Sequence, residues 1–126
     1  MPWSREETIG RGEMREIQLR KLRNTVEYVY GKNAVYRKIL DERGVKPEQV
    51  RSLDDIRRLP FTSKQLIRDH YPFGLFTAPL GEIVEFHATS GTTGKPVVVG
   101  YTRNDIELWT EVMARACTGA GIGKTD

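Results

Sequence analysis

The chain has 126 residues, of which 38% are hydrophobic and 29% charged, a composition typical of one folded domain with a modest core. It has no apolar run of the roughly 18–20 residues that cross a bilayer and no apolar segment near its N-terminus, so we expect neither a membrane span nor a secretion signal. The single cysteine, Cys117, excludes an intrachain disulfide and fits a cytoplasmic location.

The net charge of +3 is unevenly distributed. Residues 1–72 carry sixteen Lys and Arg against eleven Asp and Glu. Basic and acidic side chains alternate there, and aromatic residues are not interleaved with the basic ones as they are in surfaces that bind single strands. We therefore expect a solvated helical surface and no nucleic-acid partner.

Residues 1–72 are predicted to be helical. Apolar side chains recur at three- and four-residue spacing over residues 13–31 and predict an amphipathic helix, of which Gly31 is a plausible end. The positions expected to be buried are Leu19, Leu22, Val26, Val29 and Tyr30. Asn33 can cap a second helix that runs to Arg43. Shorter helical turns are predicted after Pro47, after a capping box that begins at Ser52, and after Thr62 or Ser63.

The sequence changes character after Pro72. Residues 73–79 mix apolar and turn residues and predict a loop, and Glu82–His87 and Pro96–Tyr101 predict two strands. A capping box that begins at Thr102 predicts a last helix, which ends near Gly119 and buries one side. The residues expected on that buried side are Ile106, Leu108, Trp109, Val112, Met113 and Ala116. The predicted class is therefore α/β, with a helical part in residues 1–72 and an α/β part in residues 73–126.

The loop between the two predicted strands is the strongest functional signal in the chain. Residues 89–96 read Thr89, Ser90, Gly91, Thr92, Thr93, Gly94, Lys95 and Pro96. Glycine lets successive backbone N–H groups turn toward one anion, hydroxyl groups add donors, and a lysine adds a positive charge. This combination predicts a phosphate-binding loop, because an ordinary hairpin turn does not require so many hydroxyls together with a lysine.

Ser90–Pro96 resembles the phosphate-loop signature of the adenylate-forming superfamily, to which acyl-CoA ligases belong. The lysine follows the proline in most of that superfamily, whereas here Lys95 precedes Pro96, as in the branch of the phenylacetate-CoA ligases. Four further segments resemble this branch, so that the similarity covers about residues 13–123: residues 59–64, 71–76, 86–88 and 100–105.

The resemblance implies a ligase that uses ATP, Mg²⁺ and CoA to activate an aromatic carboxylic acid such as phenylacetate, as part of phenylacetate catabolism. Thr89–Lys95 would then hold the β- and γ-phosphates of ATP, with Mg²⁺ sharing their charge. The motifs with which this family binds adenine and ribose, and its C-terminal lysine, are not found in the sequence. We therefore expect an N-terminal portion of such a ligase that is inactive alone and supplies no catalytic residue or metal ligand.

Two other functions remain open at this stage. One is a stand-alone phosphate- or nucleotide-binding module without catalysis, and the other is a basic helical interaction domain. Because two strands leave unpaired edges, a homo-oligomer or a complementing C-terminal chain is a possible partner. His87, near the end of a predicted strand, could transfer a proton or contact substrate, although a local hydrogen bond is more typical of such a position.

Overall fold

The computed structural model describes residues 2–90 and 94–123, in which helices lie before and after a two-stranded hairpin. The helices are α1 (Arg11–Lys32), α2 (Ala34–Glu42), α3 (Lys64–Asp69) and α4 (Arg103–Gly119), and the strands are β1 (Ile83–Ala88) and β2 (Val98–Thr102). Short 3₁₀ turns occur at Arg5–Glu7, Pro47–Gln49, Leu53–Arg58 and Leu80–Glu82. The predicted α/β class, with a helical part ahead of the first strands, is confirmed.

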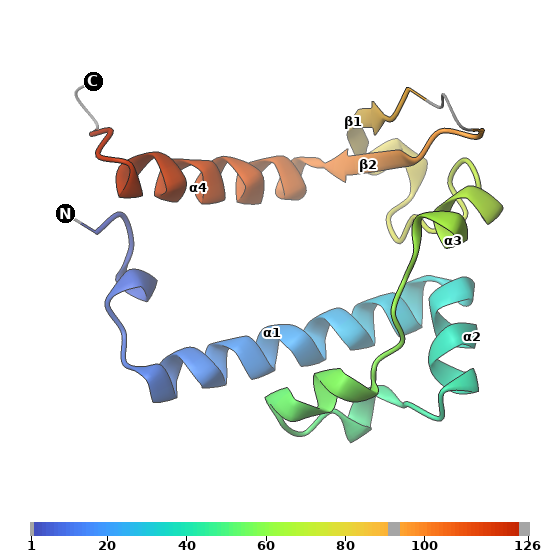
Figure 1. The fold of residues 1–126 in the computed structure, drawn as a ribbon, viewed down its shortest axis with the longest axis horizontal. Helices are drawn as coiled ribbons and strands as arrows, with labels where there is room; N and C mark the ends of the chain where they lie inside the picture. Colours follow the sequence, from blue (N-terminus) through green and yellow to red (C-terminus); the bar gives the residue numbers. More distant parts are fainter. Residues whose placement is uncertain (1, 91–93, 124–126) are drawn as a thin grey trace.

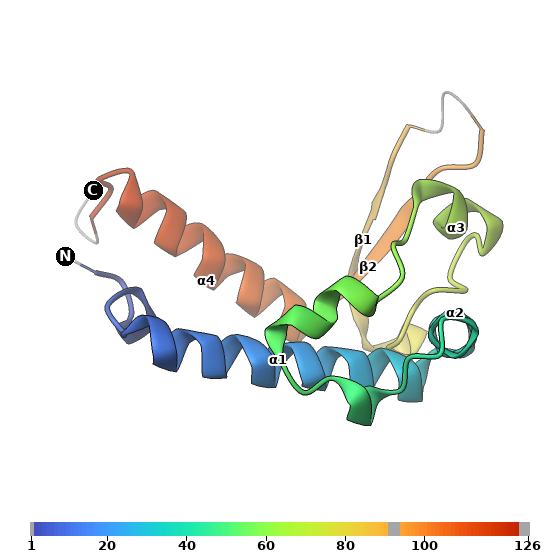
Figure 2. The same ribbon diagram turned by 60° about the horizontal axis from the view of Figure 1, so that its bottom comes forward.

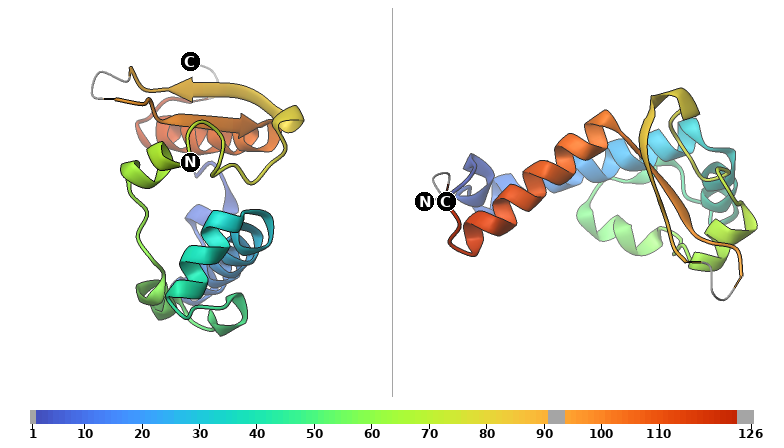
Figure 3. Two further views of the ribbon diagram at one scale, coloured as in Figure 1. Left: turned by 90° about the vertical axis from the view of Figure 1, so that its right-hand side faces the viewer. Right: turned by 90° about the horizontal axis from the view of Figure 1, so that it is seen from above.

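The elements are arranged in two layers (Figure 1). The left panel of Figure 3 shows the hairpin and α4 in one layer, and α1 and α2 in the other. The segment that leads into α3 crosses between them, as Figure 2 also shows. The segment before α1 lies near α4, where Trp3 Nε1 donates a hydrogen bond of 2.9 Å to Glu111 Oε2.

Most helix boundaries follow the predicted caps. Asn33 Oδ1 accepts hydrogen bonds from the N–H groups of Val35 and Tyr36, at 3.0 and 3.2 Å, and so caps α2. Ser63 Oγ accepts from the N–H of Leu66, which makes Ser63 rather than Thr62 the cap of α3. The predicted stop at Gly31 is wrong, because α1 continues to Lys32 and ends where Asn33 becomes extended.

The fully buried apolar side chains of the helical part form its core. Four valine and leucine side chains are at most 5% exposed, namely Val26, Leu40, Val45 and Val50. Leu22, Val29, Tyr30 and Leu59 pack against them. Four of the five side chains expected to be buried on α1 thus lie in or against this core, which joins them to α2 and the turns that follow.

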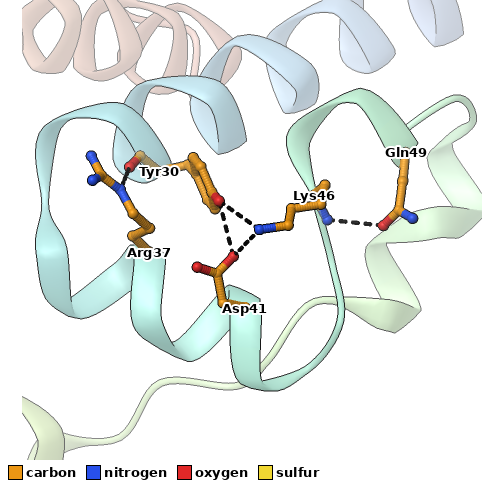
Figure 4. Close-up of polar contacts among 5 residues, drawn as sticks. All are labelled: Tyr30, Arg37, Asp41, Lys46 and Gln49. Atoms are coloured by element: carbon orange, nitrogen blue, oxygen red, sulfur yellow. Dashed lines mark hydrogen bonds and ion pairs between the residues drawn. The ribbon is translucent and has the colours of Figure 1, made fainter.

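A polar cluster fixes the corner between α1, α2 and the Pro47–Gln49 turn (Figure 4). Lys46 Nζ donates to Asp41 Oδ1 at 2.6 Å and to the hydroxyl oxygen of Tyr30 at 2.8 Å, and the Tyr30 hydroxyl donates to Asp41 Oδ1 at 2.9 Å. The hydrogen bond from Lys46, and after it that from Tyr30, lowers the pKa of the Asp41 carboxyl. The same contacts raise the pKa of the Lys46 ammonium. The cluster is charge-balanced and internally hydrogen-bonded, so we assign it a structural role.

Asn33 also connects the helical part to the segment that precedes the hairpin. Its side chain is 5% exposed, and its Nδ2 donates to the carbonyl oxygens of Gly74 and Phe76 at 2.9 and 3.0 Å. One amide group thus caps α2 with its oxygen and holds the loop of residues 73–79 with its nitrogen. A domain division at residue 72 remains a prediction, and these two hydrogen bonds cross it.

β1 and β2 pair antiparallel, with Phe86 opposite Gly100 and His87 opposite Val99. The predicted strand-to-strand connection is therefore confirmed. On one face of the hairpin the Phe86 ring packs against Phe73 and Phe76, with ring centroids 5.8 and 6.2 Å apart. Gly100 gives the Phe76 ring its space, because a Cβ at position 100 would lie 2.5 Å from Phe76 Cε2.

We expect Gly100→Ala to lower the free energy of unfolding by about 1–2 kcal/mol, because overpacking forces the Phe76 ring off its site. A urea titration followed by circular dichroism measures this change. Gly12→Ala on exposed α1 is the control, since a Cβ there meets nothing within 4 Å and alanine favours helix. An unchanged urea midpoint for Gly100→Ala would show that Phe76 does not pack there in solution.

The last helix begins as predicted but is not covered as predicted. Thr102 caps α4 in a capping box, in which Asp105 N–H donates to Thr102 Oγ1 and Thr102 N–H donates to Asp105 Oδ2. The expectation that one side of α4 is buried is wrong, because none of its residues is buried. Leu108, Trp109, Val112 and Met113 are 58, 42, 55 and 54% exposed. The Trp109 ring contacts the His87 and Tyr101 rings of the hairpin, but this contact leaves no residue of α4 buried. None of the described helices is long and apolar enough to cross a membrane.

Candidate phosphate-binding site

The predicted phosphate loop lies at the end of the hairpin away from α4 (Figure 2). Of its residues, Thr89, Ser90, Gly94 and Lys95 are described, and each is exposed. Gly91, Thr92 and Thr93 lie outside the described residues. The two strands therefore present the described residues of the loop on the surface, where they are accessible to a ligand.

Thr89 closes the base of the loop. Its N–H donates to the carbonyl oxygen of Val97 at 3.1 Å, and its Oγ1 accepts from the N–H of Val97 at 3.0 Å. Val97 itself is buried. Thr89 thus fixes the two ends of the loop against each other, and its hydroxyl hydrogen stays available to donate.

Gly94 has a positive φ, as we expect of a glycine in a phosphate-binding loop. Its φ is +130°, a conformation that residues with a side chain rarely adopt. A Cβ at this position would meet nothing within 4 Å, so the requirement for glycine is conformational rather than steric. The backbone directions on either side of Gly94 therefore depend on this residue.

Lys95 is a cation without a carboxylate partner among the described residues. Its Nζ lies 6.0 Å from the centroid of the Tyr71 ring, where a cation–π attraction is weak. Tyr71 was not predicted as a neighbour of the loop, and its only sequence signal was its place in the family-like segment of residues 71–76. Lys95 is thus an exposed ammonium without a described carboxylate partner, next to a glycine with positive φ. This combination can bind an anion.

His87 belongs to a different cluster. It is hydrogen-bonded to Glu85, two residues away on the same strand, so that a local hydrogen bond is confirmed. Its ring lies 5.0 Å from that of Tyr101 and 5.6 Å from that of Trp109. The His87 ring therefore packs on the face of the hairpin that carries α4.

A metal ion has no ready-made ligand set in the described part of the chain, where no group of three or more His, Cys, Asp and Glu side chains is close enough to hold one. The chemistry that the described donors support is anion binding by a hydroxyl-rich loop with one lysine.

Comparison with known proteins gives the same class. No family model matched the chain. It is 51% identical over 115 residues to a phenylacetate-coenzyme A ligase of Thermus thermophilus and 44% identical over 120 residues to one of Escherichia coli. These alignments cover 91 and 95% of this chain but only 26 and 28% of the two relatives.

A solved structure shares the fold over nearly the whole chain. It is that of 2-hydroxyisobutyryl-CoA ligase in complex with 2-HIB-AMP and CoA, with a TM-score of 0.86 and 35% identity, over 94% of this chain and 26% of that one. These matches define the class, and the chain belongs to the adenylate-forming CoA ligases. Because its sequence relatives are phenylacetate-CoA ligases, it corresponds to an N-terminal portion of a ligase of that family. The chain spans about a quarter of the length of these relatives.

Proposed function

We propose that this chain supplies the phosphate-binding loop of an aryl-acyl-CoA ligase that converts phenylacetate, ATP and CoA to phenylacetyl-CoA, AMP and pyrophosphate. The observation that carries the proposal is that Lys95, which has no carboxylate partner in the described part of the chain, follows Gly94, whose φ is +130°. Both lie at the end of a hairpin in a chain that superimposes on a CoA ligase. Such a ligase would act in the cytoplasm, where ATP and CoA are available.

In this proposal, a carboxylate oxygen of the acid attacks the α-phosphorus of ATP, and the bond to the β-phosphate breaks. The CoA sulfur then attacks the acyl carbon, and AMP leaves. The loop from Thr89 to Lys95 holds the departing β- and γ-phosphates by hydroxyl groups, backbone N–H groups and the Lys95 ammonium. This contribution is positioning and charge stabilisation, for which no protein nucleophile is needed. Mg²⁺ would supply additional positive charge at the same phosphates.

The residues present fit polyphosphate. Thr89 fixes the base of the loop, Gly94 has a positive φ that lets backbone N–H groups turn toward a phosphate, and Lys95 is exposed. Adenine, ribose and the acid would be bound by the part of the ligase that lies outside this sequence. We therefore expect chain 1–126 by itself to form no acyl-CoA.

The test uses a hybrid enzyme, in which residues 1–126 replace the matching segment of the Thermus thermophilus relative. We expect Lys95→Ala to slow phenylacetate-dependent exchange of pyrophosphate into ATP by about 10–100-fold. The reason is that a charge-assisted contact to a phosphate contributes about 1.5–3 kcal/mol. Lys38→Ala removes an exposed lysine from α2 and should leave the rate unchanged.

An unchanged exchange rate in Lys95→Ala would show that the loop does not hold phosphate through this residue. Calorimetric titration of chain 1–126 with pyrophosphate separates the second candidate function. Binding that Lys95→Ala abolishes, together with an inactive hybrid, would favour a stand-alone phosphate-binding module.

A further inference from the structure

The exposed apolar side chains of the chain are concentrated on its C-terminal elements. In the part of the chain that the structure describes, fifteen large hydrophobic residues are exposed, and nine of them lie in residues 80–122. The helical part, by contrast, has its own closed core around Val26 and Val50. The hairpin and α4 therefore carry a surface that this structure does not bury, although their secondary structure is fully formed.

α4 is apolar over more than one side. A groove of about 510 Å³ runs along it and is also lined by Glu85 of β1. The helix residues that line the groove recur at three- and four-residue spacing and thus share one side, namely Ile106, Trp109, Thr110, Met113, Ala114 and Cys117. Leu108 and Val112, more than half exposed, extend the apolar surface around the helix beyond this groove.

The hairpin continues this surface on its other face. Side chains alternate between the faces of a strand, so Phe86 lies on the face away from His87 and α4, and Val84 lies at the irregularity in β1 between Ile83 and Glu85. They are 51 and 55% exposed, although Phe86 also touches Phe73 and Phe76. The sheet that the described residues form has two strands only, so each strand has an unpaired outer edge.

The partner that fits must cover both faces of the hairpin and much of α4. A second copy of this chain, joined by a two-fold axis, would cover one continuous patch and leave the others exposed. A polypeptide that supplies further strands and the opposing apolar layers would cover all of them. The relatives contain such a polypeptide, because about three quarters of their length lies outside the region matched here.

We propose that α4 and the two edges of the β1–β2 hairpin form a docking surface for the remaining three quarters of an adenylate-forming CoA ligase, and that this surface binds that polypeptide even when it is a separate chain. The proposal rests on the proposed function for the identity of the partner. It is supported by the TM-score of 0.86, since the backbone that carries this surface has the same fold in a ligase of which this segment is 26%.

The experiment mixes chain 1–126 with the Thermus thermophilus relative from which the matching segment has been removed, the two being co-expressed where the latter needs its partner to fold. Sedimentation velocity is expected to show a one-to-one complex. Val112→Asp should weaken the complex at least 10-fold, because it places a charge in an apolar contact. Asn24→Asp adds the same charge to an exposed site on α1 and should leave affinity unchanged.

A second measurement does not depend on separate chains. In the hybrid enzyme, Val112→Asp should lower the urea midpoint, whereas it should leave the circular dichroism of chain 1–126 unchanged because Val112 is exposed there. An unchanged midpoint in the hybrid would overturn the docking surface. So would self-association of chain 1–126 through α4 that the ligase remainder does not displace.

The outcomes also separate this inference from the proposed function. A one-to-one complex that is sensitive to Val112→Asp but shows no Lys95-dependent pyrophosphate exchange would support docking and contradict the proposed function. An active, Lys95-dependent hybrid whose two parts do not associate when separate would support the proposed function and overturn docking in trans.

Discussion

Asn33→Ala is expected to lower the free energy of unfolding of chain 1–126 by about 3 kcal/mol. The reason is that the substitution removes a helix cap worth about 1 kcal/mol and two donated hydrogen bonds worth about 1 kcal/mol each. The carbonyl oxygens of Gly74 and Phe76 would lose their donor at a site where Asn33 is 5% exposed. A urea titration at fixed protein concentration, followed by circular dichroism, measures the loss.

Asn33→Ser distinguishes the two roles of the side chain. Serine keeps an oxygen that can cap α2 but lacks the amide donors that reach Gly74 and Phe76, so we expect a loss of about 2 kcal/mol. Asn24→Ala, on the exposed side of α1, controls for the loss of an asparagine and should be neutral or slightly stabilising. A serine variant as stable as the original chain would show that the bridge to the loop contributes nothing.

Gly94→Val is expected to slow pyrophosphate exchange by the hybrid enzyme more than 100-fold, and thus more than Lys95→Ala. A β-branched residue is excluded from φ = +130°, so the backbone N–H groups near position 94 would turn away from the phosphates. The fold should persist, because Gly94 is exposed and a Cβ there meets nothing within 4 Å.

Gly81→Val is the matched control for this loss of activity. Gly81 also has open space for a Cβ, but its φ is not positive, so valine should be tolerated and exchange unchanged. Exchange within a few-fold of the original hybrid in Gly94→Val would contradict the role of this backbone angle. A midpoint of urea unfolding equal to that of the original hybrid would confirm that any loss of activity is local.

The two proposals assign phosphate binding and docking to different parts of the chain. The loop at the end of the hairpin carries the groups for polyphosphate, and the two edges of the hairpin together with α4 carry the surface for the rest of the ligase. Asn33 ties this second layer to the helical part through the loop of residues 73–79. If α4 and the hairpin bind the rest of the ligase in this way, the same contacts also place the phosphate loop at the active site.

The local elements were readable from the sequence because their causes are local. Asn33, Ser63 and Thr102 cap helices through N–H groups two or three residues away. The hairpin followed from two β-branched runs around a glycine-rich loop, and Gly94 adopts the positive φ that such a loop needs. Gly31 misled the helix prediction because a single glycine costs an exposed helix about 1 kcal/mol at most, which neighbouring residues offset.

The sequence by itself thus determined the helices and their caps, the hairpin, and the loop with Lys95. The tertiary structure alone decided that the Asn33 amide reaches Gly74 and Phe76, that Lys95 lies near Tyr71, and that Gly100 makes room for Phe76. It also decided that the apolar side of α4 is exposed. The physical reason is that capping and turn preferences act within a few residues, whereas packing depends on which distant segments are present to cover an apolar face.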